Sequence, residues 1–231
     1  LDSLGREKAI WVGHDWGSPV VWNLASHHPE RCHAVANLCV PYYTIERGLD
    51  HTINLVDRFL YPEDEYPSGQ WDYMRLYEES FEEAIAPMDA NVHNFTKLLF
   101  RKGNPELEGA PARTATSRRD HALFGVRDIP DVPRDGDVVT EEDLSIYVAA
   151  LERNGFFGPS SWYMNHAANA TYAQSAQNDG YVDMPVLFIT AQYDYVCECA
   201  HSRLPEPMRN YCRNLTEETI RAGHWVAQEK P

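Results

Sequence analysis

One aspartate lies between two glycines at a point where the sequence pattern changes from strand to helix. Residues 9–13 form a short apolar run that ends in glycine and predicts a buried parallel strand. A helical pattern begins at Gly17, with Pro19 in the first turn, where proline is tolerated. So sharp a turn brings neighbouring backbones close together, which suits glycine at positions 13 and 17. We therefore expect the central side chain, Asp15, to be lifted clear of the sheet.

The rest of the chain predicts an α/β fold that is interrupted by a helical insertion. Residues 33–40 follow the first helix as a second strand, and residues 185–191 and 214–221 predict two later strands. Between them we find no convincing strand, only helical stretches, such as 89–100 and 141–153, and loops rich in proline and glycine. We expect a mostly parallel sheet with flanking helices, built from residues 1–41 and 180–231, and a helical cap formed by residues 42–179.

Composition excludes several classes of partner. The chain has 231 residues and a formal charge of −15, which disfavours nucleic acid and anionic membrane surfaces, and no apolar run is long enough to span a bilayer. Its five cysteines include no C-x-x-C pair, and Cys197 and Cys199 lack nearby partners with zinc-like spacing. We therefore expect isolated reduced thiols, no bound metal and a reducing compartment such as the cytoplasm.

The isolated aspartate has two interpretations, as the N-cap of the helix or as a nucleophile. Hydrolases with a nucleophile on such a turn carry an acid after a late strand and a histidine near the C-terminus. Asp194 follows the predicted strand at 185–191, and His224 follows the last predicted strand. All three residues stand in the expected order, which favours the nucleophile. The backbone N–H of Trp16 would then point toward a developing oxyanion.

At this point the sequence resembles the epoxide hydrolase family of the α/β-hydrolase fold. Residues 11–17 (Trp-Val-Gly-His-Asp-Trp-Gly) resemble the family's nucleophile segment, and residues 155–165 (Gly-Phe-Phe-Gly-Pro-Ser-Ser-Trp-Tyr-Met-Asn) resemble the cap segment that carries one ring-opening tyrosine. The latter match implies that role for Tyr163. Residues 71–77 (Trp-Asp-Tyr-Met-Arg-Leu-Tyr) are similar to the context of the second tyrosine and make Tyr73 the candidate, with Tyr77 as its competitor.

The resemblance implies a two-step reaction on a small apolar epoxide and water, with no cofactor. Tyr73 and Tyr163 would donate hydrogen bonds to the epoxide oxygen while Asp15 attacks a ring carbon and forms an alkyl ester. His224, oriented by Asp194, would activate the water that hydrolyses this ester to a vicinal diol. A carboxylate suits the scheme because its ester can be hydrolysed, whereas a serine would be left as a stable ether.

Two other functions fit parts of the same pattern. A haloalkane dehalogenase shares the aspartate nucleophile, and in it the indole N–H of Trp16 would bind the leaving halide. Paired cap tyrosines favour epoxides instead. A non-catalytic binding protein is the second alternative, because the chain begins at Leu1 and lacks the strands and the His-Gly-x-Pro segment that precede the nucleophile in the family. We expect a fragment whose oxyanion hole is incomplete, with the activity belonging to an intact parent.

Overall fold

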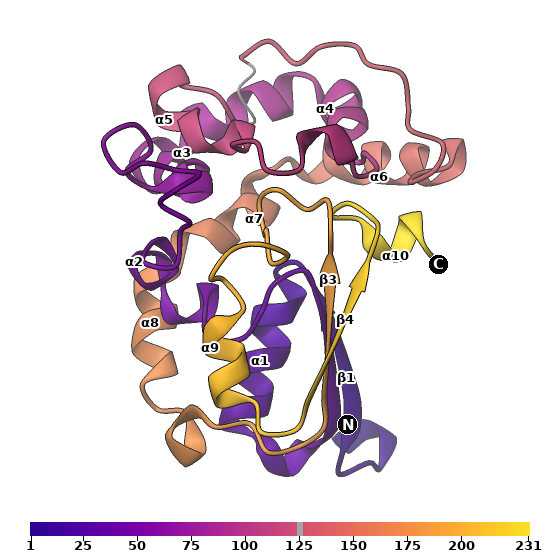
Figure 1. The fold of residues 1–231 in the computed structure, drawn as a ribbon. Coiled ribbons are helices and arrows are strands. Elements are labelled where there is room, and N and C mark those ends of the chain that lie inside the picture. The colour runs from indigo at the N-terminus through magenta and orange to yellow at the C-terminus, as the bar shows by residue number, and fades with distance from the viewer. Residues whose placement is uncertain (124–126) are drawn as a thin grey trace. The chain divides into compact units, whose positions relative to one another are not determined.

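The computed structural model describes residues 1–123 and 127–231, which form two compact units (Figure 1). The sheet unit consists of Leu1–Val56 and His166–Arg221, and the helical unit consists of Asp57–Asn165 and Ala222–Pro231. Residues 42–56 and 166–179 therefore group with the sheet, although the sequence places them in the cap. The functional boundaries of the cap remain a prediction.

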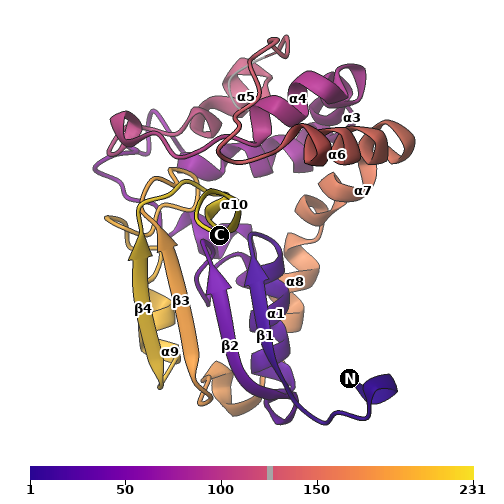
Figure 2. The same cartoon turned by 90° about the vertical axis from the view of Figure 1, so that its right-hand side faces the viewer.

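Four parallel strands make up the sheet and run side by side in the order of the sequence (Figure 2). They are β1 (Ala9–His14), β2 (Cys32–Leu38), β3 (Val186–Ala191) and β4 (Leu215–Ile220). The sequence predicts all four, the first three because apolar runs bounded by turn residues are typical of parallel strands, and the last as a shorter strand before Gly223. Within the described residues no further strand lies between β2 and β3, as expected for a helical insertion. Since all four strands are parallel, their C-terminal ends all lie at the same end of the sheet.

The helices of the sheet unit pack on one face of the sheet (Figures 1 and 2). Trp22 and Phe188 are fully buried between the two layers, and the indole Nε1 of Trp22 donates a hydrogen bond to the carbonyl oxygen of Val40 at 3.0 Å. This buried layer holds the C-terminal edge of the sheet in place. The helices are α1 (Gly17–His27), α2 (Leu49–Ile53), α8 (His166–Ala173) and α9 (Glu206–Tyr211). α1 and α9 lie next to the sheet, and α8 lies on their outer side (Figure 1).

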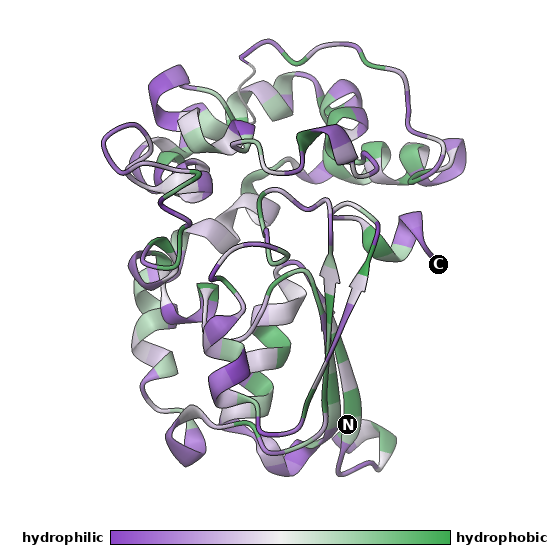
Figure 3. Ribbon diagram, in the orientation of Figure 1, coloured by the Kyte–Doolittle hydropathy of each residue, from purple (hydrophilic) through white to green (hydrophobic). Residues whose placement is uncertain are grey.

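β1 is an edge strand, and Figure 3 colours much of it as hydrophobic. Ile10 is 66% exposed and Val12 is 67% exposed, so the expectation of a fully buried strand is wrong for these two side chains. On β2, Ala34 pairs with Ile10 and Ala36 pairs with Val12, so these side chains lie on the same face of the sheet. β4, at the opposite edge, is polar and carries exposed glutamates, a pattern that protects an edge strand from unwanted pairing.

The helical unit contains no strand in its described residues. Its helices are α3 (Asp72–Ala90), α4 (Val92–Leu99), α5 (Ser117–Asp120), α6 (Glu141–Asn154), α7 (Phe157–Ser160) and α10 (Val226–Glu229). α6 begins with a capping box, in which Thr140 and Asp143 satisfy each other's backbone N–H groups. The single helix that the sequence predicts at 89–100 is divided, because Asn91 leaves the helical conformation and its side chain caps α4. Across the described part of the chain, no helix combines the length and the apolar character needed to cross a bilayer.

A buried carboxyl group follows β2. Glu46 is 1% exposed and accepts hydrogen bonds from the backbone N–H groups of Tyr43 and Thr44. Burial raises its pKa from 4.5 to about 7, against the opposite influence of these hydrogen bonds and of Arg47. The folded chain therefore binds a proton at Glu46 more tightly than the unfolded chain does.

We expect the free energy of unfolding to decrease as the pH rises from about 4.5 to 7. Below this pH window Glu46 is protonated in both the folded and the unfolded chain, so its pKa shift adds no pH dependence to the free energy of unfolding. Above the window Glu46 is ionised in both states, and the folded chain holds a buried charge. The shift corresponds to about 3 kcal/mol at most. Chemical denaturation at several pH values should show a smaller decrease for Glu46→Gln than for the wild type. Glu218→Gln, at an exposed position of β4, serves as the control. Parallel pH profiles for wild type and Glu46→Gln would contradict the assignment.

Candidate active site

Asp15 occupies the tight turn between β1 and α1 in a left-handed backbone conformation, with φ at 51°. Few non-glycine residues adopt this region, and holding one there costs of order 1–3 kcal/mol. Its carbonyl oxygen accepts a hydrogen bond from the N–H of Ser18 at 2.9 Å, which closes the turn. The N-cap of α1 is Trp16, without a side-chain capping bond. An N-cap residue is typically extended, so the backbone of Asp15 does not fit the N-cap interpretation.

Only one of the two flanking glycines is required by space. A Cβ atom on Gly13 would lie 2.5 Å from the carbonyl oxygen of Gly17 and 2.5 Å from Oδ1 of Asn37. A Cβ atom on Gly17 would meet nothing within 4 Å. The expectation that both positions need a small residue is therefore correct for Gly13 and wrong for Gly17. The crowding arises from the backbone of residue 17, not from its side chain.

Asp194 lies beyond the C-terminal end of β3, and Asp15 lies beyond the C-terminal end of β1, so both are at the same end of the sheet. The residue is 3% exposed. Its Oδ1 accepts hydrogen bonds from the backbone N–H groups of Val196 at 3.2 Å and Cys197 at 3.0 Å. These bonds fix the carboxylate within its own loop and compensate part of the cost of burying a charge. In the sheet unit, Asp15 and Asp194 thus both lie at the C-terminal ends of the strands.

His224 belongs to the helical unit, and hydrogen bonds fix the residues directly before and after it in its loop. Oε2 of Glu229 accepts hydrogen bonds from the N–H of Gly223 at 2.8 Å and from the N–H of Gly103 at 3.0 Å. The indole Nε1 of Trp225 donates to the carbonyl oxygen of Leu99 at 2.7 Å. The sequence offered no signal for the bridging role of Glu229, because one of its partners is far away in the chain.

Removing the carboxylate of Glu229 should loosen this loop. Glu229→Ala leaves two backbone N–H groups without their acceptor, and we expect a loss of about 1–3 kcal/mol in the free energy of unfolding. Glu229→Gln keeps an oxygen that can accept, so it should retain most of the stability. Denaturant titration of the three proteins measures the difference. Equal stability of Glu229→Ala and the wild type would show that the bridge contributes nothing.

Three tyrosine rings form a cluster in the helical unit. The ring of Tyr73 meets that of Tyr163 edge-on, with centroids 5.5 Å apart and an interplanar angle of 71°. Tyr77 stacks on Tyr163 with centroids 4.6 Å apart and an angle of 6°. The two residues predicted to open the ring, Tyr73 and Tyr163, are therefore neighbours, and so is the competitor, Tyr77. Burial raises the pKa of Tyr77 to about 12, so its phenol is neutral near pH 7.

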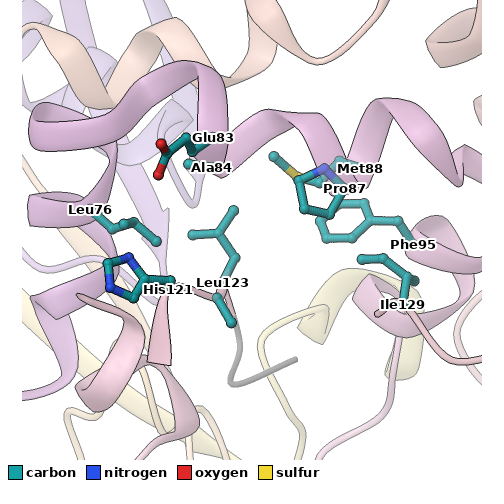
Figure 4. A pocket seen from close by; sticks show the side chains of 10 residues that line it. Leu76, Glu83, Ala84, Pro87, Met88, Phe95, His121, Leu123 and Ile129 are labelled. Atoms are coloured by element: carbon teal, nitrogen blue, oxygen red, sulfur yellow. The ribbon is translucent and has the colours of Figure 1, made fainter. Parts of the chain in front are cut away.

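A separate small cavity lies in the helical unit beside the kinked helix α3 (Figure 4). Its walls are mostly apolar side chains, with Glu83 and His121 as the charged or titratable members. It has room for about 20 Å³, the space of roughly one water molecule. None of the predicted catalytic residues lines it. This cavity is too small for an organic substrate and lies outside the candidate site.

All five cysteines are buried, and none of them forms a disulfide in the structure. Burial raises the pKa of the Cys32, Cys199 and Cys212 thiols, the last to about 12, which disfavours the reactive thiolate. Within either unit taken alone, the described residues bring no three His, Cys, Asp or Glu side chains close enough together to hold a metal ion.

Comparison with known proteins identifies the family. Residues 1–231 match the family described as alpha/beta hydrolase fold. The chain is 30% identical to epoxide hydrolase B of Mycobacterium tuberculosis over 259 residues, which cover 100% of this chain and 70% of that protein. It is also 30% identical to bifunctional epoxide hydrolase 2 of Sus scrofa over 233 residues, but spans only 38% of that longer protein.

A solved structure agrees with this result. Epoxide hydrolase A from Mycobacterium thermoresistibile superposes with a TM-score of 0.73 at 29% identity, over 100% of this chain and 68% of that one. The fold that the sequence predicts is thereby confirmed as the α/β-hydrolase fold. This chain belongs to the epoxide hydrolases of the α/β-hydrolase family.

Proposed function

We propose that the protein carrying this chain hydrolyses a small apolar epoxide to a vicinal diol through an alkyl ester on Asp15. The observation that carries the proposal is the aspartate in the left-handed turn between β1 and α1. A serine there would give an ether with an epoxide carbon, and water could not release it by attack on a carbonyl. A carboxylate gives an ester, which water can cleave at the carbonyl carbon of the enzyme itself.

In the first step, a carboxylate oxygen of Asp15 forms a bond to one ring carbon while the bond from that carbon to the epoxide oxygen breaks. The electron pair moves to the epoxide oxygen, which takes up a proton. Tyr73 and Tyr163 supply the hydrogen bonds that stabilise this developing alkoxide. Their adjacent rings in the helical unit support a shared role, because two donors must converge on a single oxygen atom.

In the second step, His224 accepts a proton from water, and the hydroxyl attacks the ester carbonyl of Asp15. The backbone N–H of Trp16 stabilises the resulting oxyanion. As the oxyanion collapses, the bond from the carbonyl carbon to the diol oxygen breaks and His224 gives its proton to that oxygen. The proton left on the Asp15 carboxyl returns to solvent and balances the one taken up in the first step. Asp194 orients the imidazole and stabilises its protonated form, as buried carboxylates do in related triads. The fixed carboxylate of Asp194 and the pinned loop of His224 are both compatible with these roles.

A single turnover of an aryl epoxide in ¹⁸O-labelled water tests the proposal. The oxygen that enters from water during ester hydrolysis stays on the carboxylate, so mass spectrometry should find the label in the peptide that contains Asp15. Asp15→Ala should form no diol. The proposal fails if the diol carries the label and Asp15 does not. It also fails if the protein releases halide from a 1-bromoalkane and leaves the epoxide unchanged, which is the behaviour of a dehalogenase.

A further inference from the structure

Tyr77 is tied to the segment that carries Tyr163. Its hydroxyl oxygen accepts a hydrogen bond from Oγ of Ser160 at 3.4 Å, and both residues are buried, at 5% and 3% exposure. Ser160 is the last residue of α7, and Tyr163 follows it in the next turn of the chain. The contact therefore joins α3 directly to the short stretch of helix that presents Tyr163.

A second contact holds the same segment at its start. The backbone N–H of Phe156 donates to Oδ1 of Asp89 at 2.9 Å, and the ring of Phe157 meets that of Phe81 edge-on at 5.6 Å. Asp89, Phe81 and Tyr77 all lie on α3. This helix thus fixes the cap segment at several points along its length. Of these three residues, Tyr77 is the one whose ring touches the ring of Tyr163.

The ring geometry distinguishes Tyr77 from Tyr73. Tyr77 and Tyr163 are parallel and stacked, an arrangement that restrains the plane of the Tyr163 ring. Tyr73 meets both rings edge-on, at 71° to Tyr163 and 72° to Tyr77. We propose that Tyr77 is a positioning residue, whose stacked ring sets the orientation of Tyr163, while Tyr73 keeps the donor role proposed above. This inference rests on the proposed function.

The alkylation and hydrolysis steps separate this role from a general effect on structure. Tyr163 acts when the epoxide opens, so a misplaced Tyr163 should slow formation of the Asp15 ester without changing its hydrolysis. We expect Tyr77→Leu to slow ester formation by about 10- to 100-fold, because displacements of about 1 Å can cost that much. Tyr77→Phe keeps the stacked ring and should stay within a few-fold of the wild type. Rapid-quench mass spectrometry follows the formation and decay of the ester separately.

Matched variants test the assignment. Tyr147→Leu removes another stacked aromatic pair of the helical unit, with Phe100, and should leave ester formation unchanged. If Tyr77→Phe is as slow as Tyr77→Leu, the hydroxyl of Tyr77 carries the effect, through Ser160 or through the substrate, and the inference that the stacked ring orients Tyr163 is overturned. If Tyr77→Leu does not fold, the rate of ester formation in Tyr77→Phe relative to the wild type still decides, because a large decrease in Tyr77→Phe alone overturns the inference. A wild-type rate for folded Tyr77→Leu also refutes the inference. Absence of any Asp15 ester in the wild type would instead refute the proposed function.

Discussion

His224→Gln is expected to trap the enzyme as its alkyl ester. Glutamine cannot take a proton from water, so the first step should proceed while the second slows by about 10²- to 10⁴-fold, the usual contribution of a general base. Intact-protein mass spectrometry after mixing with an aryl epoxide should show one added substrate mass, and peptide mapping should place it on Asp15.

The matched control for this prediction is His33→Gln, an exposed histidine on β2. This variant should turn over like the wild type and accumulate no adduct. Two results are incompatible with the role of His224: diol formation at the wild-type rate in His224→Gln, or an adduct that maps to a residue other than Asp15.

Gly13→Ala is expected to be the most damaging single-methyl change in the sheet unit, whereas Gly17→Ala should be harmless. The added Cβ at position 13 meets a backbone oxygen at 2.5 Å that cannot move without opening the turn. Overpacking of this kind costs about 3 kcal/mol, and the displaced Asp15 should lose most of its activity as well. At position 17 the new methyl group meets no atom within 4 Å, and alanine is a better helix former than glycine.

Denaturant unfolding and epoxide turnover of the two glycine variants measure this contrast. Because both changes add the same methyl group within the same turn, each variant is the control for the other. Equal losses at the two positions would mean that the turn tolerates or rejects side chains for a reason other than the approach of the Gly17 carbonyl.

The sequence predicted the sheet well because parallel strands have a local signature. Runs of apolar residues bounded by turns located β1 to β3. Asp15 follows β1, Asp194 follows β3, and His224 follows β4, the polar strand that the sequence predicts less clearly. The roles of these three residues are still predictions. The exposure of Ile10 and Val12 in particular depends on which face of the sheet the helices cover, and the apolar run of the strand does not show that.

What the sequence missed depends on contacts between distant residues. The bond between Ser160 and Tyr77 joins residues on different helices, so no periodicity announces it. The same holds for Glu229, which accepts a hydrogen bond from Gly103 although the two residues are 126 positions apart in the sequence. The sequence makes Tyr73 the candidate and Tyr77 its competitor, and both stand on the same face of one helix. Their different ring geometry against Tyr163 is the basis of our proposal that they have different roles.

The pairing of β2 with β3 has a consequence for how the length of the insertion can vary. Val35 pairs with Val186, so this pairing closes a loop that contains every residue between the two strands. The entropy of closing a loop grows only with the logarithm of its length, and each doubling costs about 0.6 kcal/mol. Folding rate is more sensitive, because non-local strand pairing is slow. Insertions of very different size can therefore be accommodated at this point of the sheet, with a change mainly in how fast the chain folds.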